Sequence, residues 1–342
     1  MAKTVSPILD SHEHDWIHLV LCPVWSLGLG LLIGLTPLAT WKLSGFGLAT
    51  PVAEAFLGAF VMAHLVLVFF RSHADPEIRA LYPIRFWVVP PALLLILLFC
   101  GPAVAVASAV AAWWDVYHSS LQTFGIGRIF DAKAGNDPEA GRSLDLILSV
   151  LLYAGPVLGG AMLLYHAREL YEFEAVGWKT AGEWMWRVIA FQPRIRVALL
   201  ASGGVFLAVY LAAYARLVKK GYRPPRQKVA LHLGTAVVSV WAWGFNPLGM
   251  ALFIMNFFHA WQYFALVWRY HRETVMKPLG LPKTAKGRLW ALGAMIGAGF
   301  FYGSVFGVLG ELFHWALAVT LVVSLMHFWY DGFIWSVRRR QV

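Results

Sequence analysis

The chain of 342 residues is 59% hydrophobic and only 13% charged, with a mean hydropathy of +0.63. Soluble domains carry about 25% charged residues, so this composition excludes a water-soluble enzyme and indicates an integral membrane protein. The two cysteines, Cys22 and Cys100, stand in apolar stretches, which excludes a disulfide framework and a cysteine-rich metal site. The net charge is +10, and the basic residues that cause it cluster between the apolar segments. Basic residues at such positions set membrane topology and contact lipid headgroups, so no nucleic-acid partner is expected.

Apolar segments that approach the roughly 20 residues of a membrane span recur along the chain. They predict an all-α fold, a polytopic integral membrane bundle of about 10 transmembrane helices in a single membrane domain. The predicted spans, in chain order, are Trp16–Leu38, Ala49–Phe70, Phe86–Cys100, Pro102–Gly125, Leu144–Tyr165, Val197–Leu217, Val229–Phe245, Leu248–Trp268, Leu289–Leu309 and Leu312–Val337. The third is short and contains Pro90 and Pro91, so we expect it to be tilted, broken or re-entrant.

Lysine and arginine set the orientation of these spans. With the N-terminus inside, 22 of the 28 basic residues fall on the cytoplasmic side, as the positive-inside rule requires. We therefore expect a multi-pass protein of a bacterial-type inner (plasma) membrane with both termini in the cytoplasm. Five of the six remaining basic residues follow the fifth span, around EWMWRVIAF, a stretch predicted to lie along the membrane interface. The basic loop KKGYRPPRQK is interpreted as a topology determinant, with docking of an acidic ferredoxin-like electron donor as the alternative.

Polar side chains inside the predicted spans gather on a few helical faces. They are His64, Asp115, His118, Gln122, His259, Gln262, His327 and Asp331. A carboxylate in the bilayer core costs several kcal/mol unless it has a partner. Asp115 stands three positions before His118, and Asp331 four positions after His327, so each carboxylate shares a helical face with an imidazole.

The histidines of four separate spans are predicted to lie at similar depths. Counted from the basic end of each helix, His64 lies roughly 10 Å from the cytoplasmic boundary, and His118, His259 and His327 roughly 15 Å. His18, with His14 one turn earlier, is expected to cap this layer. Imidazole and carboxylate donors without thiolate suit iron, zinc, manganese or copper. The predicted metal ligands are His18, His64, His118, His259, His327 and Asp331.

A membrane site built from histidines on separate helices, at positions such as His18 and His64, resembles the non-haem iron enzymes that act on lipids. These include desaturases, hydroxylases and, more closely, the carotene-cleaving oxygenases of the Brp/Blh type, in which such histidines hold one iron. The desaturase-type HxxHH boxes are absent from this sequence, and its one HxxxH pair is His14 and His18. The resemblance implies an all-helical membrane body, non-haem iron and an apolar substrate.

The leading functional hypothesis is therefore an oxygen-dependent metalloenzyme, an oxygenase or oxidase that uses O2 to oxidise a lipid-soluble molecule. The cofactor is expected to be non-haem iron, one or two ions, with another transition metal as an option. Asp115 is predicted to be a ligand or to orient an imidazole, and Gln122 and Gln262 to orient a bound water or oxygen species. The alternatives are a haem- or quinone-linked electron-transfer protein, a proton-coupled transporter and, should the metal be zinc, a hydrolase or isomerase.

Overall fold

The computed structural model describes residues 9–45, 48–246 and 251–335, and the chain falls into two compact units. The first unit comprises Met1–Gly30, Ala112–Met255 and Trp335–Val342, and the second comprises Leu31–Ala111 and Asn256–Ile334. Apart from one short hairpin, the regular structure of the described residues is helical, which confirms the predicted helical class.

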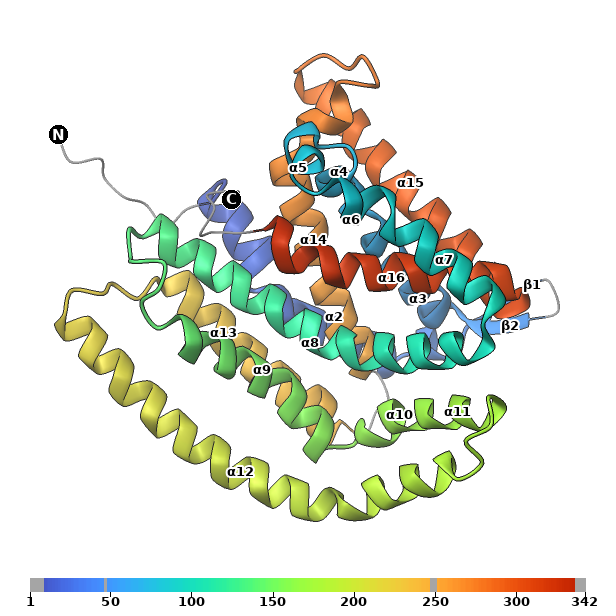
Figure 1. The fold of residues 1–342 in the computed structure, drawn as a ribbon. Helices are drawn as coiled ribbons and strands as arrows, with labels where there is room; N and C mark the ends of the chain where they lie inside the picture. Colours follow the sequence, from blue (N-terminus) through green and yellow to red (C-terminus); the bar gives the residue numbers. More distant parts are fainter. Residues whose placement is uncertain (1–8, 46–47, 247–250, 336–342) are drawn as a thin grey trace. The chain divides into compact units, whose positions relative to one another are not determined.

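The helices of the first unit come from its N-terminal segment and from its long central segment. They are α1 (His12–His14), η1 (Asp15–Val20), α2 (Cys22–Gly34), α8 (Gly101–Lys133), α9 (Arg142–Gly159), α10 (Leu163–Ala167), η3 (Arg168–Tyr171), α11 (Glu172–Ala175), α12 (Ala181–Lys219), α13 (Arg226–Ser239) and η4 (Val240–Phe245). Helices α2 and α8 continue into the second unit. Helix α12 packs along α9, as Figure 1 shows.

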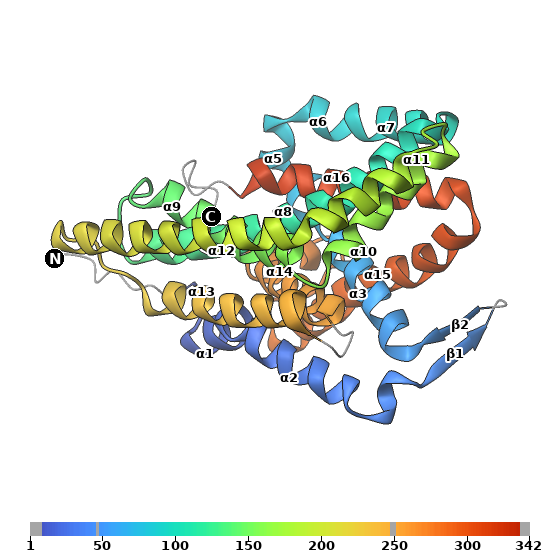
Figure 2. The ribbon, with the colours of Figure 1, turned by 90° about the horizontal axis from the view of Figure 1, so that it is seen from below.

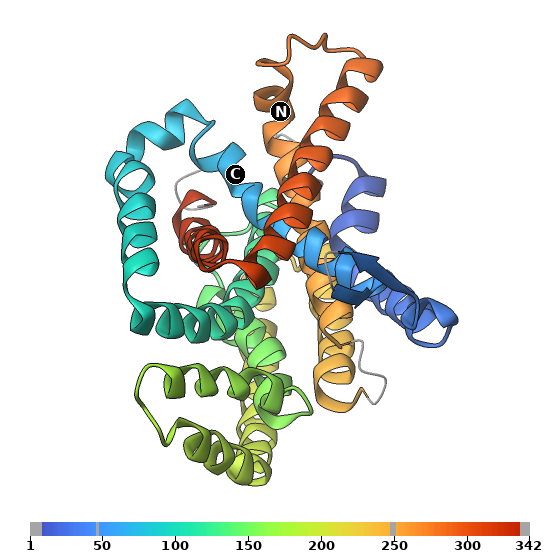
Figure 3. The ribbon, with the colours of Figure 1, turned by 90° about the vertical axis from the view of Figure 1, so that its right-hand side faces the viewer.

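The second unit contains the hairpin and the remaining helices. Its elements are η2 (Pro37–Ala39), β1 (Lys42–Gly45), β2 (Leu48–Pro51), α3 (Val52–Val66), α4 (Val68–Ser72), α5 (Pro76–Leu81), α6 (Pro83–Trp87), α7 (Val89–Phe99), α14 (Ala251–Met276), α15 (Ala285–Leu312) and α16 (His314–Ile334). Strands β1 and β2 pair antiparallel and lead from α2 into α3 (Figure 2). Helices α14 and α15 are joined at one end by the loop at the top of Figure 3.

Five helical segments among the described residues are long and apolar enough to cross a membrane. They are Val52–Ser72, Arg142–Gly159, Ala181–Lys219, Ala285–Leu312 and His314–Ile334. A sixth candidate is the pair His12–Val20 and Cys22–Gly34, which is bent by 53° at its break. These segments overlap six of the ten predicted spans. Within the described residues, no helix in the other four meets the same criterion, and Leu248–Trp268 begins at positions 248–250, which lie outside the described residues.

The third predicted span is divided in the structure. Pro83 begins α6, and Pro90 and Pro91 stand in the first turn of α7, where a missing backbone N–H removes no helical hydrogen bond. Helix α7 has 11 residues and is by itself about 16 Å long, about half of a hydrocarbon core of about 30 Å; together with α6 it forms the apolar helical stretch Pro83–Phe99. The prolines thus begin a short apolar helix instead of interrupting a long one.

The predicted interfacial stretch EWMWRVIAF is part of a longer element. It forms the start of α12, which runs unbroken for 39 residues through Pro193 and into the sixth predicted span. A helix of this length extends about 58 Å, almost twice the thickness of a bilayer core. One end of α12 therefore extends beyond any single crossing.

A buried charge cluster joins the helices of the first unit. It consists of Arg128, Asp131, Asp145 and Lys228. Lys228 Nζ lies 2.7 Å from Asp131 Oδ2 and 2.6 Å from Asp145 Oδ2, and Arg128 Nη1 lies 2.6 Å and 2.8 Å from the same two oxygens. Two cations balance two carboxylates, which is the condition for burying charges in an apolar protein.

Three tyrosines complete the charge cluster. Tyr210 and Tyr214 donate to Asp145 Oδ1, and Tyr222 donates to Asp131 Oδ1. Lys228, the last residue of the loop interpreted as a topology determinant, is thus buried and joins α13 to α8 and α9. Asp145, near the start of the fifth predicted span, is a buried carboxylate that the sequence reasoning did not single out.

Small residues bring α15 against α3 in the second unit. A Cβ added at Gly303 would lie 2.0 Å from the carbonyl oxygen of Ala59, and one at Gly299 would lie 3.2 Å from the Ala63 side chain. Spacings of four residues between small side chains let membrane helices approach closely. This contact fixes the position of α3 immediately before His64.

Candidate metal centre

Three histidines of the second unit form a buried group, here called the three-histidine cluster: His64, His259 and His327. His64 lies in the last turn of α3, His259 on α14 and His327 on α16. The ring centroid of His64 lies 5.1 Å from that of His259 and 4.9 Å from that of His327, with interplanar angles of 89° and 80°. Edge-to-face rings at this distance direct nitrogens toward a shared space instead of stacking.

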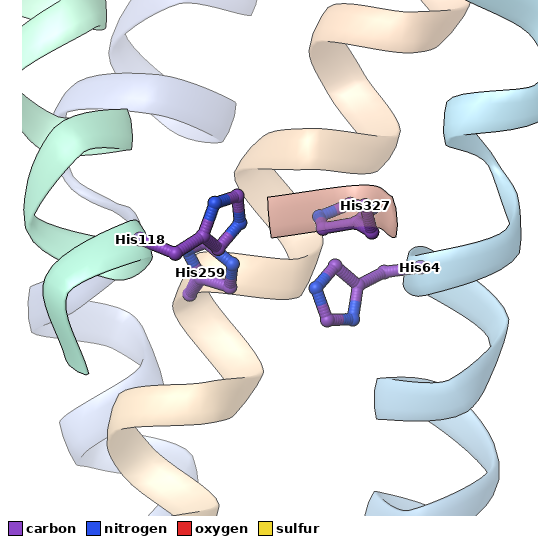
Figure 4. Close-up of side chains that lie close together, drawn as sticks. All are labelled: His64, His118, His259 and His327. Atoms are coloured by element: carbon purple, nitrogen blue, oxygen red, sulfur yellow. The ribbon is translucent and has the colours of Figure 1, made fainter. Parts of the chain in front are cut away.

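Figure 4 shows these histidines together with His118, which belongs to α8 in the first unit. One ring nitrogen of each of the four lies within 4.8 Å of the others, and all four residues are buried. Of these four predicted ligands, His64, His259 and His327 lie together within the second unit. The proposals below rest on the three that share one unit.

The protonation of two of these imidazoles follows from their hydrogen bonds. His64 Nδ1 lies 2.5 Å from the carbonyl oxygen of Val61, and His327 Nδ1 lies 3.0 Å from that of Leu65. A carbonyl oxygen only accepts, so each Nδ1 carries the proton and each Nε2 keeps a lone pair. Metal-bound histidines characteristically donate their second ring N–H to a carbonyl or carboxylate.

One nitrogen in the cluster lacks a protein partner. His64 Nε2 is buried and has no hydrogen-bond partner among the described residues. A buried polar atom left unpaired costs about 1–3 kcal/mol, and such atoms in native structures call for an explanation. A bound metal ion would satisfy this lone pair, because Nδ1 is already committed to Val61.

Asp331 lies beside the cluster and is not part of the four-residue group. Its Oδ2 is 3.7 Å from His327 Nε2, and its Oδ1 accepts a hydrogen bond of 3.0 Å from the hydroxyl of Tyr263. Tyr263 is buried, with its ring centroid 4.7 Å from that of His327. The sequence reasoning overlooked Tyr263, although it stands four residues after His259 and so shares its helical face.

An aromatic wall adjoins the three-histidine cluster. Phe60, one turn before His64 on α3, stacks on Phe257 and Phe264 of α14 with ring centroids 4.9 Å and 5.1 Å away. All three phenylalanines are buried. These buried, stacked rings make the packing between α3 and α14 apolar one helical turn from His64.

The other predicted site residues occupy several places in the chain. Asp115 and Gln122 lie on α8 in the first unit, and Gln262 is buried on α14. His18 lies in η1, with its ring centroid 5.1 Å from that of His14. Neither His18 nor Asp115 belongs to the four-residue group.

Imidazole nitrogens without thiolate fit a first-row transition metal, and iron, zinc and copper all accept such donors. The donor set, the fixed Nδ1 protons and the unpaired Nε2 of His64 together make this group a candidate metal centre. The chain matches no protein-family model, no curated protein and no solved structure. Its function is therefore argued from this centre.

Proposed function

We propose that this protein is a membrane-bound metalloenzyme in which His64, His259 and His327 bind a transition-metal ion. The observation that carries the proposal is the buried, unpaired Nε2 of His64 beside two further imidazoles. We further propose that the enzyme oxidises a lipid-soluble substrate with O2. Non-haem iron is the metal that best matches this reaction. In this respect the centre resembles that of the Brp/Blh-type oxygenases.

When bound, iron supplies the redox chemistry that activates oxygen. The chain's own residues prepare the place for it. The carbonyl oxygens of Val61 and Leu65 hold the Nδ1 protons of His64 and His327, so that both imidazoles present neutral Nε2 atoms. Phe60, Phe257 and Phe264 make the packing beside His64 apolar, which favours an apolar substrate.

The three candidate oxidations differ in where the oxygen atoms of O2 go and in whether they need electrons from a donor. Hydroxylation places one oxygen atom in the product and one in water, and it consumes two electrons, one from each of two reduced ferredoxin-like donors, and two protons from water. Cleavage of a carbon–carbon double bond places both oxygen atoms in the two carbonyl products and needs no external reductant. Desaturation removes two hydrogens from the substrate and, like hydroxylation, takes two electrons from ferredoxin-like donors and two protons from water, while O2 becomes two water molecules.

The geometry disfavours the haem alternative. A porphyrin fills four positions around its iron and leaves at most two for protein side chains. The three mutually close imidazoles of the second unit exceed that number. A non-haem ion can use all of them.

Metal analysis and oxygen uptake test the proposal. Purified protein in lipid should contain stoichiometric iron and show no Soret band, and the iron-loaded protein should consume O2 with an isoprenoid or acyl-chain substrate. Dependence of uptake on an added ferredoxin separates hydroxylation and desaturation from cleavage. Stoichiometric zinc, or turnover that is unchanged without oxygen, would replace the oxygenase with a hydrolase or isomerase.

The proposal includes a membrane topology. Ten spans with both termini in the cytoplasm of a bacterial-type inner membrane are supported by the distribution of basic residues along the sequence. In that arrangement the three-histidine cluster lies below the cytoplasmic headgroups. Acyl chains and isoprenoids could then reach the cluster laterally from the bilayer.

A further inference from the structure

Arg71 is a buried cation whose partners lie on separate helices. It lies on α4, seven residues after His64, and its side chain is 7% exposed. Its Nε and Nη2 both donate to the carbonyl oxygen of Ile334, at 3.1 Å and 3.0 Å. Ile334 is the last residue of α16, where helical carbonyl oxygens lack intrahelical donors and favour a cation.

The same guanidinium also reaches α14. Arg71 Nη1 lies 3.4 Å from His271 Nε2 and 3.6 Å from Asp75 Oδ2. Arginine only donates, so the neutral His271 ring accepts this hydrogen bond through Nε2. Arg71 thereby contacts α14 and α16 from its own position directly after α3.

Two of these contacts are to α14 and α16, which carry His259 and His327, and Arg71 itself follows α3, which carries His64, after the break at Leu67. Ile334 follows His327 by seven residues, and His271 follows His259 by twelve. In helical rise, Arg71 follows His64 by roughly 10 Å across the break at Leu67, Ile334 follows His327 by roughly 10 Å, and His271 follows His259 by roughly 18 Å. Metal–imidazole bonds of about 2.0–2.1 Å require helix positions that are reproducible to about 0.5 Å.

We propose that Arg71 is a positioning residue for the three-histidine cluster, because its guanidinium links α4, α14 and α16 and so sets the spacing of His64, His259 and His327. This inference rests on the proposed metal site. The planar fork of arginine is essential to it, since it allows two donors to reach Ile334 while a third reaches His271. Lysine keeps the charge but offers one nitrogen, so it cannot reproduce this geometry.

Cobalt(II) binding to the full-length protein in lipid nanodiscs tests the inference, because its visible d–d absorption reports coordination number and geometry. The Arg71→Lys variant should bind cobalt at least tenfold more weakly than wild type and show a shifted, altered d–d spectrum. Arg79→Lys is the matched control, because Arg79 is exposed and donates to the carbonyl oxygen of His73 on the adjacent loop. It should match wild type in affinity and spectrum.

A second pair of variants keeps the test decisive if Arg71→Lys does not fold. His271→Leu removes the contact to α14 and should change the cobalt spectrum, whereas His271→Gln retains an acceptor and should restore the wild-type spectrum. If Arg71→Lys folds and shows the wild-type spectrum and affinity, the positioning role is overturned. If Arg71→Lys does not fold, a wild-type spectrum and affinity in His271→Leu overturn it. In both cases the metal site itself is unaffected. Failure of the wild-type protein to bind cobalt or iron would overturn the positioning role and the metal site together.

Discussion

His327 donates its Nδ1 proton to the carbonyl oxygen of Leu65, the residue that directly follows His64. One short segment of α3 therefore supplies an imidazole to the cluster and fixes the tautomer of a second imidazole on α16. Leu67, two residues further on, separates α3 from α4. The positions of His64 and His327 are coupled through this segment.

Alanine substitutions in the cluster should remove the metal. His64→Ala, His259→Ala and His327→Ala should each lower bound metal to background in elemental analysis, because each removes one nitrogen donor. His118→Ala tests, by the same measurement, the further ligand that was predicted from its depth in the fourth span. The controls are His166→Ala and His314→Ala, whose rings bond to the carbonyl oxygens of Met162 and Leu97 and whose loss should leave the metal content unchanged. Full metal content in all cluster variants would show that the cluster is structural.

Close packing of α15 on α3 predicts opposite effects for two glycines on one helix. Gly303→Ala places a methyl group 2.0 Å from the carbonyl oxygen of Ala59, so the helices must separate, at a cost of about 1–3 kcal/mol. Gly307→Ala meets no atom within 4 Å and should be neutral or stabilising, since alanine favours helix. Unfolding in detergent followed by circular dichroism compares them. Equal stability of the two variants would contradict the close approach.

The charge cluster of the first unit predicts a large effect for one lysine. Lys228→Met leaves Asp131 and Asp145 with Arg128 as their remaining cation, and breaking a buried ion pair costs about 3–5 kcal/mol. Lys283→Met is the control, because Lys283 forms an exposed ion pair with Glu273, and such pairs contribute little to stability. The measurement is the free energy of unfolding in detergent. A Lys228→Met protein as stable as wild type would mean that the buried pairs contribute nothing.

His271 predicts an acid-sensitive contribution to stability. Burial, and then the charge of Arg71, lowers the pKa of His271 to about 4, while Asp75 opposes this shift. The unfolded chain, with a histidine pKa near 6.5, therefore takes up the proton first as pH falls. The stability that the neutral ring contributes is fully present above about pH 6.5 and is lost between there and pH 4.

This loss amounts to roughly 2 kcal/mol between pH 7 and pH 4.5. The His271→Gln variant does not titrate in this range, so its free energy of unfolding should fall less than that of wild type by about that amount. The difference between the two proteins isolates His271 from the other histidines. Parallel pH profiles would show that His271 does not carry this shift.

The proposed topology predicts that both ends of the chain face the cytoplasm. Cysteines introduced at positions 3 and 341, which lie outside the described residues, should both be protected from a membrane-impermeant thiol reagent in spheroplasts and labelled after lysis. Replacement of Cys22 and Cys100 by alanine removes the native background. Labelling of one end in intact spheroplasts would require an odd number of spans.

The sequence alone was sufficient to predict the helical class and apolar segments long enough to cross a membrane. Hydropathy and helical spacing are properties of local sequence, so Val52–Ser72 and His314–Ile334 could be recognised from their residues. The depth of an imidazole follows from its distance to the basic end of the same helix. These quantities need no knowledge of which helices are neighbours.

Tertiary packing decided which polar groups are partners. Depth alone does not say which helices are adjacent, so it could not select the partners of an imidazole. Residues far apart in the chain are joined by three such contacts: the hydrogen bond from His327 to Leu65, the hydrogen bonds from Arg71 to Ile334, and the ion pairs of buried Lys228. Such contacts depend on how whole helices are rotated and how closely they approach. Close contacts between helices, such as Gly303 against Ala59, set this geometry, and the residue pattern along any one helix does not encode it.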